Sequence, residues 1–208
     1  MKEKNSHITG IILSGGLSIR MGTDKALLKI GDKTIIERTR NLMLNIFENV
    51  LLSTNDFESY RFLGLPMVED IYKNHGPLSG IHAALVASAT DKNFFLSCDL
   101  PLMEEEMIRY IIGYKSLRQI SIPSANERMQ HLCGIYRKLL VSVIENILSN
   151  SIHWKKENGK SAASVKKLIS KVGAEIIETR SLPFYKKDIF FNMNSPDDFE
   201  IIKQKNLE

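Results

Sequence analysis

The feature that most constrains this chain is an apolar run near the N-terminus that leads into a glycine-rich, cationic stretch. Residues 8–13 are almost entirely apolar, and Gly15 and Gly16 follow one position later. Such a run predicts a buried strand. Glycines let the backbone turn sharply with its N–H groups pointing into open space, and Arg20 and Lys25 place cations beside that space. This combination is typical of a site that holds a polyphosphate.

Two better-known phosphate-binding motifs are not matched by the sequence. The dinucleotide fingerprint G-x-G-x-x-G is absent, because Gly15 and Gly16 are adjacent and the next glycine is Gly22. Residues 159–161 match only the end of the P-loop pattern, with Trp154 at its first glycine position. An ordinary turn would explain the adjacent glycines alone. The cations Arg20 and Lys25 and the carboxylate of Asp24 close to these glycines favour phosphate binding.

Size and composition set the class of protein. With 208 residues and 43% hydrophobic content, the chain is expected to form a single domain over residues 1–208. The net charge of +4 is spread over dispersed basic residues, which argues against nucleic-acid binding. Cys98 and Cys133 lie within apolar runs and suggest no disulfide framework. No run is long enough for a membrane span or a secretory signal, so we expect a cytoplasmic protein.

Strand-like and helix-like patterns alternate along the chain, which predicts one α/β domain with a mainly parallel sheet. Thr34 and Glu37 form a plausible capping box before one helix, and Pro196 opens the last helix behind residues suited to an N-cap. The predicted strands are residues 8–13, 50–52, 67–68, 93–98, 120–123, 132–136, 174–177 and 189–191, and the predicted helices are 34–47, 77–89, 104–114, 138–148, 164–170 and the segment from 196 onward.

Polar residues end several of the predicted strands. In a parallel sheet, ligands bind beyond the carboxyl ends of the strands. We therefore expect the segments 14–25 and 53–55 to converge with Asp70 and Asp99 at one edge of the sheet.

Two carboxylates stand out at that edge. Asp99 directly follows an apolar strand and comes shortly before Pro101, so it is expected to be rigidly held and half desolvated. Such a group suits Mg²⁺, which takes one or two protein carboxylates and fills its other positions with phosphate oxygens and water. The alternative for Asp99 is capping of the next helix. Asp70 is a candidate for the metal, for a ribose hydroxyl or for a turn.

No protein nucleophile is evident in the sequence. His75, His82 and His131 have no partner at catalytic or metal-ligand spacing, and Ser14 and Ser18 lack a G-x-S-x-G elbow. A phosphate loop, cations and a metal carboxylate without a nucleophile fit phosphoryl or nucleotidyl transfer, in which catalysis is mostly positioning and charge neutralisation.

Residues 13–28, which begin Leu-Ser-Gly-Gly and continue through Arg-Met-Gly-Thr-Asp-Lys, resemble the L-A-G-G-x-x-x-R-M-G-x-D-K loop of the molybdenum cofactor guanylyltransferases. Later segments are similar to the same family along the whole chain. These are Glu-Asp at 69–70 with Gly-Pro-Leu-Ser-Gly-Ile at 76–81, Cys-Asp-Leu-Pro at 98–101, a variant of H-P-L-x-G-x-Y at 131–136, and Asn-Met-Asn-Ser-Pro-Asp-Asp at 192–198.

This resemblance implies a Rossmann-like, three-layer nucleotidyltransferase fold with a mainly parallel sheet and helices on both faces. It also implies Mg²⁺-dependent transfer of GMP from GTP to the terminal phosphate of molybdopterin-bound molybdenum, with release of pyrophosphate. Molybdenum-insertion proteins and target molybdoenzymes are then possible partners. The implied site residues are Leu13, Ser14, Gly15, Gly16, Lys25, Ser53, Asp70 and Asp99 for the nucleotide, Arg20, Lys25 and Asp99 for catalysis, Asp99 for the metal, and Asn192 and Asn194 for the acceptor.

Some positions depart from the family pattern. Ser14 replaces the usual alanine, and Ser53 stands where many members have a nucleotide-contacting asparagine, with Asn55 nearby. Leu-Cys at 132–133 replaces the Pro-Leu that follows the histidine, so no role is assigned to His131.

Other functions remain open at this stage. A sister enzyme could use CTP on the same cofactor, but Gly15 favours the guanylyl branch, because cytidylyl relatives tend to carry alanine there. A sugar-phosphate nucleotidyltransferase generally places its lysine further along, after a proline, unlike Lys25. A non-catalytic nucleotide-binding module is disfavoured by the presence of Arg20, Lys25 and Asp99 together.

Overall fold

The computed structural model describes residues 3–15, 24–125, 128–158 and 163–205. The predicted roles of Gly16 and Arg20 and the partial P-loop match at 159–161 therefore lie outside the described residues. No helix within these ranges is long and apolar enough to cross a membrane.

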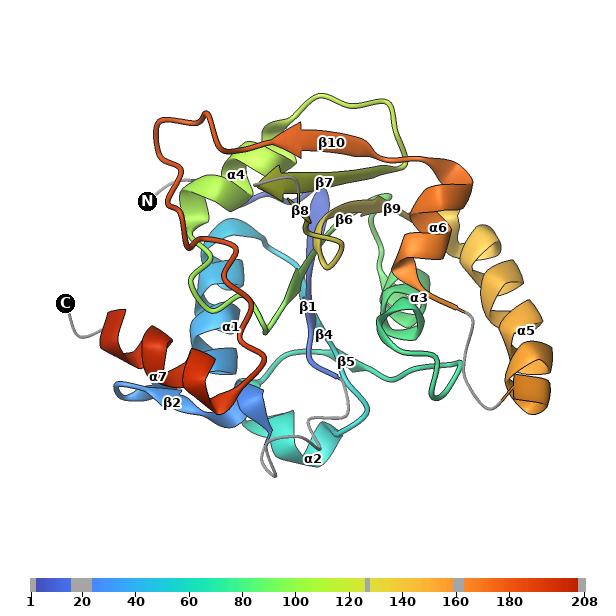
Figure 1. Cartoon of the computed structure of the whole chain (residues 1–208), viewed down its shortest axis with the longest axis horizontal. Helices are drawn as coiled ribbons and strands as arrows, with labels where there is room; N and C mark the ends of the chain where they lie inside the picture. The colour runs from blue at the N-terminus through green and yellow to red at the C-terminus, as the bar shows by residue number, and fades with distance from the viewer. Residues whose placement is uncertain (1–2, 16–23, 126–127, 159–162, 206–208) are drawn as a thin grey trace.

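A mainly parallel sheet forms the centre of the molecule, which confirms the predicted fold class (Figure 1). Its order is β10-β7-β9-β6-β1-β4-β5, with β8 paired to β7. β9 runs antiparallel to both of its neighbours, whereas β1 pairs in parallel with β4 and β6. The strands are β1 Ile8–Leu13, β4 Val50–Ser53, β5 Met67–Val68, β6 Lys92–Ser97, β7 Ile120–Ala125, β8 Arg128–Met129, β9 Cys133–Arg137 and β10 Glu175–Glu178.

Helices cover both faces of the sheet and complete three layers. α1 and α4 lie on one face, and α3, α5 and α6 on the other (Figure 1). Phe94 and Phe95 on β6 show the alternation, because Phe94 belongs to the core under α1 and α4 and Phe95 to the core under α3 and α5. The helices are α1 Ile35–Ile46, α2 Phe57–Tyr60, α3 Pro77–Ala87, α4 Glu105–Gly113, α5 Val141–Asn158, α6 Val165–Val172 and α7 Pro196–Lys205, with 3₁₀ turns at Lys25–Leu27, Arg61–Leu63 and Lys138–Leu140.

The central strand explains why the first apolar run is so regular. All six residues of β1 are buried, since a strand in the middle of a parallel sheet has helices over both faces. The predicted capping box of α1 is also present. The backbone N–H of Glu37 donates to Thr34 Oγ1 at 3.3 Å, and the N–H of Thr34 donates to Glu37 Oε2 at 2.7 Å.

One local prediction differs from the structure. Residues 189–191, predicted as a strand, form a turn, in which the N–H of Ile189 donates to the carbonyl of Lys186 at 3.0 Å and that of Phe191 to Asp188 at 2.8 Å. Ile189 and Phe190 are buried as anchors of the main core rather than as members of the sheet. Their apolar character therefore reports burial, not strand pairing.

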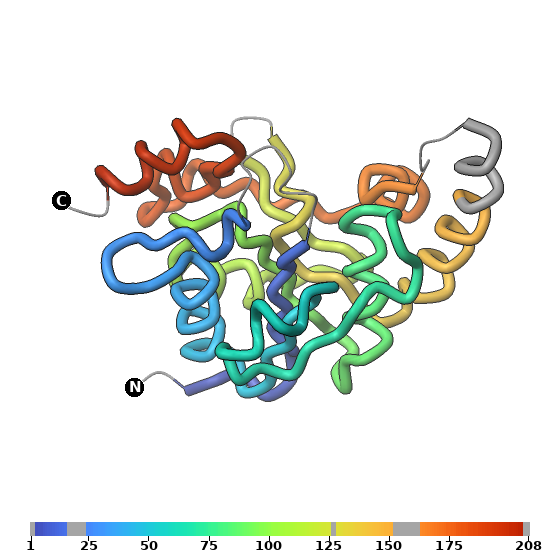
Figure 2. The backbone as a smooth tube through the Cα atoms, turned by 90° about the horizontal axis from the view of Figure 1, so that it is seen from below, coloured from blue at the N-terminus to red at the C-terminus, as the bar shows by residue number. Residues whose placement is uncertain are grey.

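A short hairpin was not predicted. β2 (Lys29–Ile30) pairs with β3 (Lys33–Thr34) across Gly31 and Asp32, with Gly31 at a φ of 66°. A glycine-aspartate pair between short strands is a hairpin signal that the sequence does carry. The hairpin lies against α7 in both views of the chain (Figures 1 and 2), and Ile30, Ile35, Met193 and Ile202 form the core between them.

Candidate active site

The carboxyl ends of four strands meet at one edge of the sheet, as predicted. The N–H of Ser14 donates to the carbonyl of Ser53 at 3.0 Å, and the N–H of Cys98 donates to the carbonyl of Leu13 at 3.2 Å. The N–H of Thr54 donates to the carbonyl of Val68 at 2.9 Å. These bonds continue the ladders just beyond β1, β4, β5 and β6, so the residues that follow them share one edge.

Asp99 is held in place by its neighbours at this edge. Ser97 Oγ donates to Asp99 Oδ1 at 2.9 Å, and the N–H of Met193 donates to the Asp99 carbonyl at 2.9 Å. The N-cap of α4 is Glu104, so Asp99 does not cap the next helix. Ser97 therefore orients the half-buried carboxylate and Met193 holds the main chain, while the carboxylate serves no capping role.

Asp70 lies on the other side of β1 and is tied to Asn55. Asn55 Nδ2 donates to Asp70 Oδ2 and the N–H of Asp70 donates to Asn55 Oδ1, both at 3.0 Å. Gly80 of α3 lies close to Ser53 and Asp70, because a Cβ atom there would lie 2.8 Å from Ser53 Oγ and 3.6 Å from Asp70 Oδ1. Glycine at position 80 thus leaves room for both polar side chains beside Leu13.

Lys25 reaches the same edge from the first turn after the glycine-rich segment. Its Nζ atom donates to the carbonyl of Met193 at 3.2 Å, and Met193 in turn donates to the Asp99 carbonyl. Asp24 caps this turn, since its Oδ1 atom accepts from the N–H of Ala26 at 3.0 Å. The structure therefore brings together Lys25 and Asp99, two of the three residues predicted for catalysis.

Tyr60 is a site residue that sequence reasoning missed. Ser14 Oγ donates to the Tyr60 hydroxyl at 2.7 Å, and that hydroxyl donates to the Asp24 carboxylate. Burial, followed by the hydrogen bond to Asp24, raises the pKa of Tyr60 well above its ordinary value, so its hydroxyl stays protonated. No motif marks Tyr60, because its contact with the segment depends on how α2 folds back over the end of β1.

A cleft of about 780 Å³, lined by both polar and apolar side chains, opens beside Asp99. Asn192 lines it and donates through Nδ2 to the carbonyl of Phe190 at 3.1 Å. Asn194, in contrast, is not among the lining residues, and its N–H donates to Asp198 Oδ2 at 2.7 Å at the start of α7. The other lining residues are Ser97, Leu100, Arg128, Met129, Gln130, His131, Leu132, Lys166, Ile169 and Ser170.

The cleft carries positive charge. Arg128 comes from β8 and Lys166 from α6. Burial lowers the pKa of His131 below its ordinary value, and the nearby charge of Lys166 lowers it further. His131 is one of the residues that line the cleft, although no role was assigned to it from the sequence pattern. Arg128 and Lys166 stand in no motif, so only the fold shows that they face the same space as Asp99.

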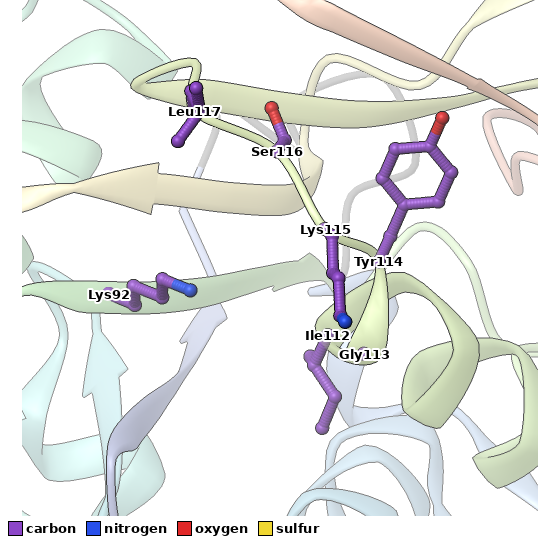
Figure 3. A pocket seen from close by; sticks show the side chains of 7 residues that line it. All are labelled: Lys92, Ile112, Gly113, Tyr114, Lys115, Ser116 and Leu117. Carbon is purple, nitrogen blue, oxygen red and sulfur yellow. The ribbon is translucent and has the colours of Figure 1, made fainter.

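A second, smaller hollow of about 300 Å³ lies at the opposite end of β6. Lys92 and residues 112–117 line it (Figure 3). Its charged groups are Lys92 and Lys115, and no carboxylate lines it. Because it lies at the amino end of β6, away from Asp99, it takes no part in the site at the carboxyl edge.

Comparisons with known proteins show which family the chain belongs to. A family model described as the MobA-like NTP transferase domain matches residues 10–162. A Clostridium perfringens protein named "Probable molybdenum cofactor guanylyltransferase" is 33% identical over 204 residues, 94% of this chain and 96% of the relative. A Pelotomaculum thermopropionicum protein of the same name is 37% identical over 140 residues, 67% of this chain and 68% of the relative.

Solved structures show the same fold. Molybdopterin-guanine dinucleotide biosynthesis protein A from Archaeoglobus fulgidus superposes with a TM-score of 0.77 at 20% identity, over 95% of this chain and 97% of that one. A protein from Aquifex aeolicus superposes with a TM-score of 0.70 at 30% identity, over 90% of this chain and 93% of that one. The family model spans most of the chain and the Clostridium perfringens relative matches it nearly end to end, so this chain belongs to the MobA-like NTP transferase family.

Proposed function

We propose that this protein transfers GMP from GTP to the terminal phosphate of molybdopterin-bound molybdenum, releases pyrophosphate and forms the guanine dinucleotide cofactor. The names of the full-length relatives support this assignment. The observation that carries it is the hydrogen-bonded link from Lys25 through Met193 to Asp99, beside a cationic cleft. A phosphate-binding lysine, a carboxylate and an anion-accepting cleft are the parts that nucleotidyl transfer requires.

The nucleotide half of the site lies over the ends of β1 and β4. In this proposal Leu13, Ser14, Gly15 and Gly16 hold the guanine and phosphates, Lys25 and Arg20 neutralise phosphate charge, and Ser53 and Asp70 contact the nucleoside. The close approach of Gly80 to Ser53 and Asp70 supports this placement, because a side chain at position 80 would displace the Ser53 hydroxyl. Asn55 orients Asp70 through the paired hydrogen bonds described above.

The donor set at Asp99 fits Mg²⁺. No group of three His, Cys, Asp or Glu side chains in the described ranges is arranged to hold a metal on its own. Mg²⁺ is suited to a single carboxylate such as Asp99, because substrate phosphates and water supply its remaining ligands. When bound, Mg²⁺ would supply charge neutralisation at the phosphates. Ser97 keeps the Asp99 carboxylate oriented by donating to Oδ1.

The acceptor half occupies the cleft beside Asp99. Arg128 and Lys166 offer cations to the terminal phosphate of the acceptor, and Asn192 offers an amide to its pterin side. Asn194 lies outside the cleft lining, so a contact of Asn194 with the acceptor would have to come from the adjoining surface.

The reaction needs no protein nucleophile. An oxygen of the acceptor's terminal phosphate attacks the α-phosphorus of GTP, and the bond from that phosphorus to the bridging oxygen breaks as pyrophosphate leaves. The protein contributes by holding both phosphates in line and by countering their mutual repulsion with Lys25 and the cleft cations. The proteins that would deliver molybdenum or receive the product stay predictions from the sequence.

Substitution of Asp99 tests this assignment. We expect Asp99→Asn to lower pyrophosphate release from GTP and molybdenum cofactor by at least about 100-fold, because it removes the charge while keeping the shape. Glu106→Gln on α4, an exposed carboxylate outside the cleft, is the matched control and should leave turnover unchanged. Unchanged turnover in a folded Asp99→Asn protein would contradict the assignment.

A further inference from the structure

The hydroxyl of Tyr60 connects the two flanks of the glycine-rich segment. Ser14, just beyond the end of β1, donates to it at 2.7 Å, and the hydroxyl donates in turn to the carboxylate of Asp24, directly before Lys25. Both flanking residues belong to the described chain. One side chain from α2 therefore fixes how the end of β1 lies relative to the residue that precedes Lys25.

Tyr60 is itself rigidly held. Only 2% of its surface is exposed, and it lies at the end of α2, whose N-cap Asp56 accepts from the N–H of Ser59 at 3.0 Å. A buried tyrosine must satisfy its hydroxyl. Here both hydrogen-bond partners of the hydroxyl, Ser14 and Asp24, flank the glycine-rich segment. Tyr60 therefore does more than pack in the core.

The Asp24 carboxylate passes this constraint on to Lys25. Its Oδ1 atom accepts from the N–H of Ala26 at 3.0 Å, and its other oxygen accepts from Tyr60. The main-chain carbonyl of Asp24 accepts from the N–H of Leu27 at 3.0 Å. The turn that carries Lys25 is thus anchored at its first residue. From this turn the Lys25 Nζ atom reaches the carbonyl of Met193 at 3.2 Å.

The hydrogen bond to Tyr60 also explains the role of Ser14, which departs from the family pattern. Ser14 stands where the family pattern has alanine, and its side chain is 5% exposed. A buried hydroxyl without a partner would cost stability. Donation to Tyr60 satisfies it, whereas alanine would leave Tyr60 tied to Asp24 alone. Ser14 therefore adds a second attachment that the common alanine lacks.

We propose that Tyr60 is a positioning residue that ties the two flanks of the glycine-rich segment together and so holds Lys25 where the nucleotide phosphates bind. This proposal relies on the proposed function only for the identity of the nucleotide. The hydrogen bonds that Tyr60 forms with Ser14 and Asp24 are present in the protein without ligand.

Tyr60→Phe isolates the hydroxyl. The ring, its burial and its packing are kept, and only the two hydrogen bonds are lost. Asp24 is half-buried, so water can hydrate its released oxygen. The matched control is Tyr110→Phe on α4, whose ring packs against Tyr114 and Phe184 outside the site.

The first measurement is amide hydrogen exchange of the nucleotide-free proteins. We expect the N–H groups of Ala26 and Leu27 to exchange about fivefold faster in Tyr60→Phe than in the wild type, as the loss of one hydrogen bond predicts. Ser14→Ala should have a smaller effect in the same direction. Exchange in β6 should be unchanged in both, and Tyr110→Phe should leave Ala26 and Leu27 unchanged.

The second measurement is steady-state turnover of GTP with molybdenum cofactor. We expect Tyr60→Phe to raise the KM for GTP about fivefold with a smaller change in kcat, because the tie prepares the phosphate site before the reaction. Faster exchange at Ala26 and Leu27 together with this KM change supports the proposal. Unchanged exchange at those amides, or faster exchange throughout the chain with an unchanged KM, overturns it. A wild type that does not use GTP would refute the proposed function instead, while the exchange experiment would still decide on the tie.

Discussion

The Nζ atom of Lys25 donates to the main-chain carbonyl of Met193 at 3.2 Å, joining residues that are 168 positions apart in the chain. The N–H of Met193 donates at the same time to the carbonyl of Asp99 at 2.9 Å. The main chain of Met193 thus sets the spacing between Lys25 and the backbone of Asp99, the residues proposed to bind phosphate and metal. The Met193 side chain is fully buried with Ile30, Ile35 and Ile202, which fixes that spacing.

Truncation of Met193 should therefore affect both stability and the nucleotide. We expect Met193→Ala to lower the free energy of unfolding by about 2–5 kcal/mol, since it opens a cavity in a buried cluster, and to raise the KM for GTP. Chemical denaturation and steady-state kinetics measure the two effects. Met107→Ala, a buried methionine of α4, should lose similar stability but keep the KM for GTP. An equal change of KM in both variants would show that Met193 acts through stability alone.

Neutralisation of Lys25 tests the other end of this link. Lys25→Met should lower kcat/KM for GTP by about 100-fold or more, because it removes a fixed positive charge from the phosphate site. Thermal unfolding should change little, since Lys25 is only half-buried. Lys29→Met, an exposed lysine on the neighbouring hairpin, is the control with the same chemical change. Equal losses in the two variants would show that general charge matters and not the position of Lys25.

The close packing of Gly80 against Ser53 gives a steric prediction. Gly80→Ala would place a Cβ atom 2.8 Å from Ser53 Oγ, so the Ser53 side chain must rotate away. We expect the KM for GTP to rise several-fold while the stability changes by less than about 1 kcal/mol, because a helical alanine offsets the crowding. Gly113→Ala on α4 meets no atom within 4 Å and should leave turnover unchanged. A normal KM for Gly80→Ala would remove Ser53 from the nucleotide site.

His131 and Lys166 give a prediction that depends on pH. Burial and then Lys166 hold the pKa of His131 below its ordinary value of 6.5. Lys166→Gln should therefore raise this pKa, as a proton NMR titration of the imidazole would show, and should raise the KM for the molybdenum cofactor but not for GTP. Lys167→Gln on the same helix does not line the cleft and should change neither.

The sign of the stability effect follows from the same shift. Below pH 6.5 the unfolded state binds a proton at His131 more readily than the native state does. His131 therefore lowers the free energy of unfolding progressively as the pH falls from 6.5 to its native pKa. Lys166→Gln should reduce this loss. A His131 pKa that does not move in Lys166→Gln would show that the two groups do not interact.

The parts of the fold that were predictable are those set by local patterns. The apolar residues of β1 and the polar residues after each strand predicted the sheet and the edge where Ser14, Ser53 and Asp99 converge, because parallel strands end together. The capping box of Thr34 and Glu37 likewise predicted the start of α1. In these cases the nearby sequence contains the physical cause.

The parts that were missed depend on contacts between distant segments. Tyr60 meets Asp24 only because α2 folds back over β1, and Lys166 faces His131 only because α6 lies beside the cleft. The apolar residues Ile189 and Phe190 were mistaken for a strand, since burial in a turn and burial in a sheet select the same side chains. Pairing of Lys25 with Met193 likewise has no local signal.

The central claim is that this protein transfers GMP to molybdenum cofactor, and product analysis with competing nucleotides tests it most directly. Purified protein is incubated with molybdenum cofactor, Mg²⁺ and equal concentrations of GTP, CTP and ATP, and the products are identified by mass spectrometry together with released pyrophosphate. We predict formation of the guanine dinucleotide in clear excess, and a loss of at least about 100-fold in Asp99→Asn. Predominant formation of the cytosine dinucleotide, or pyrophosphate release without any dinucleotide product, would contradict the account.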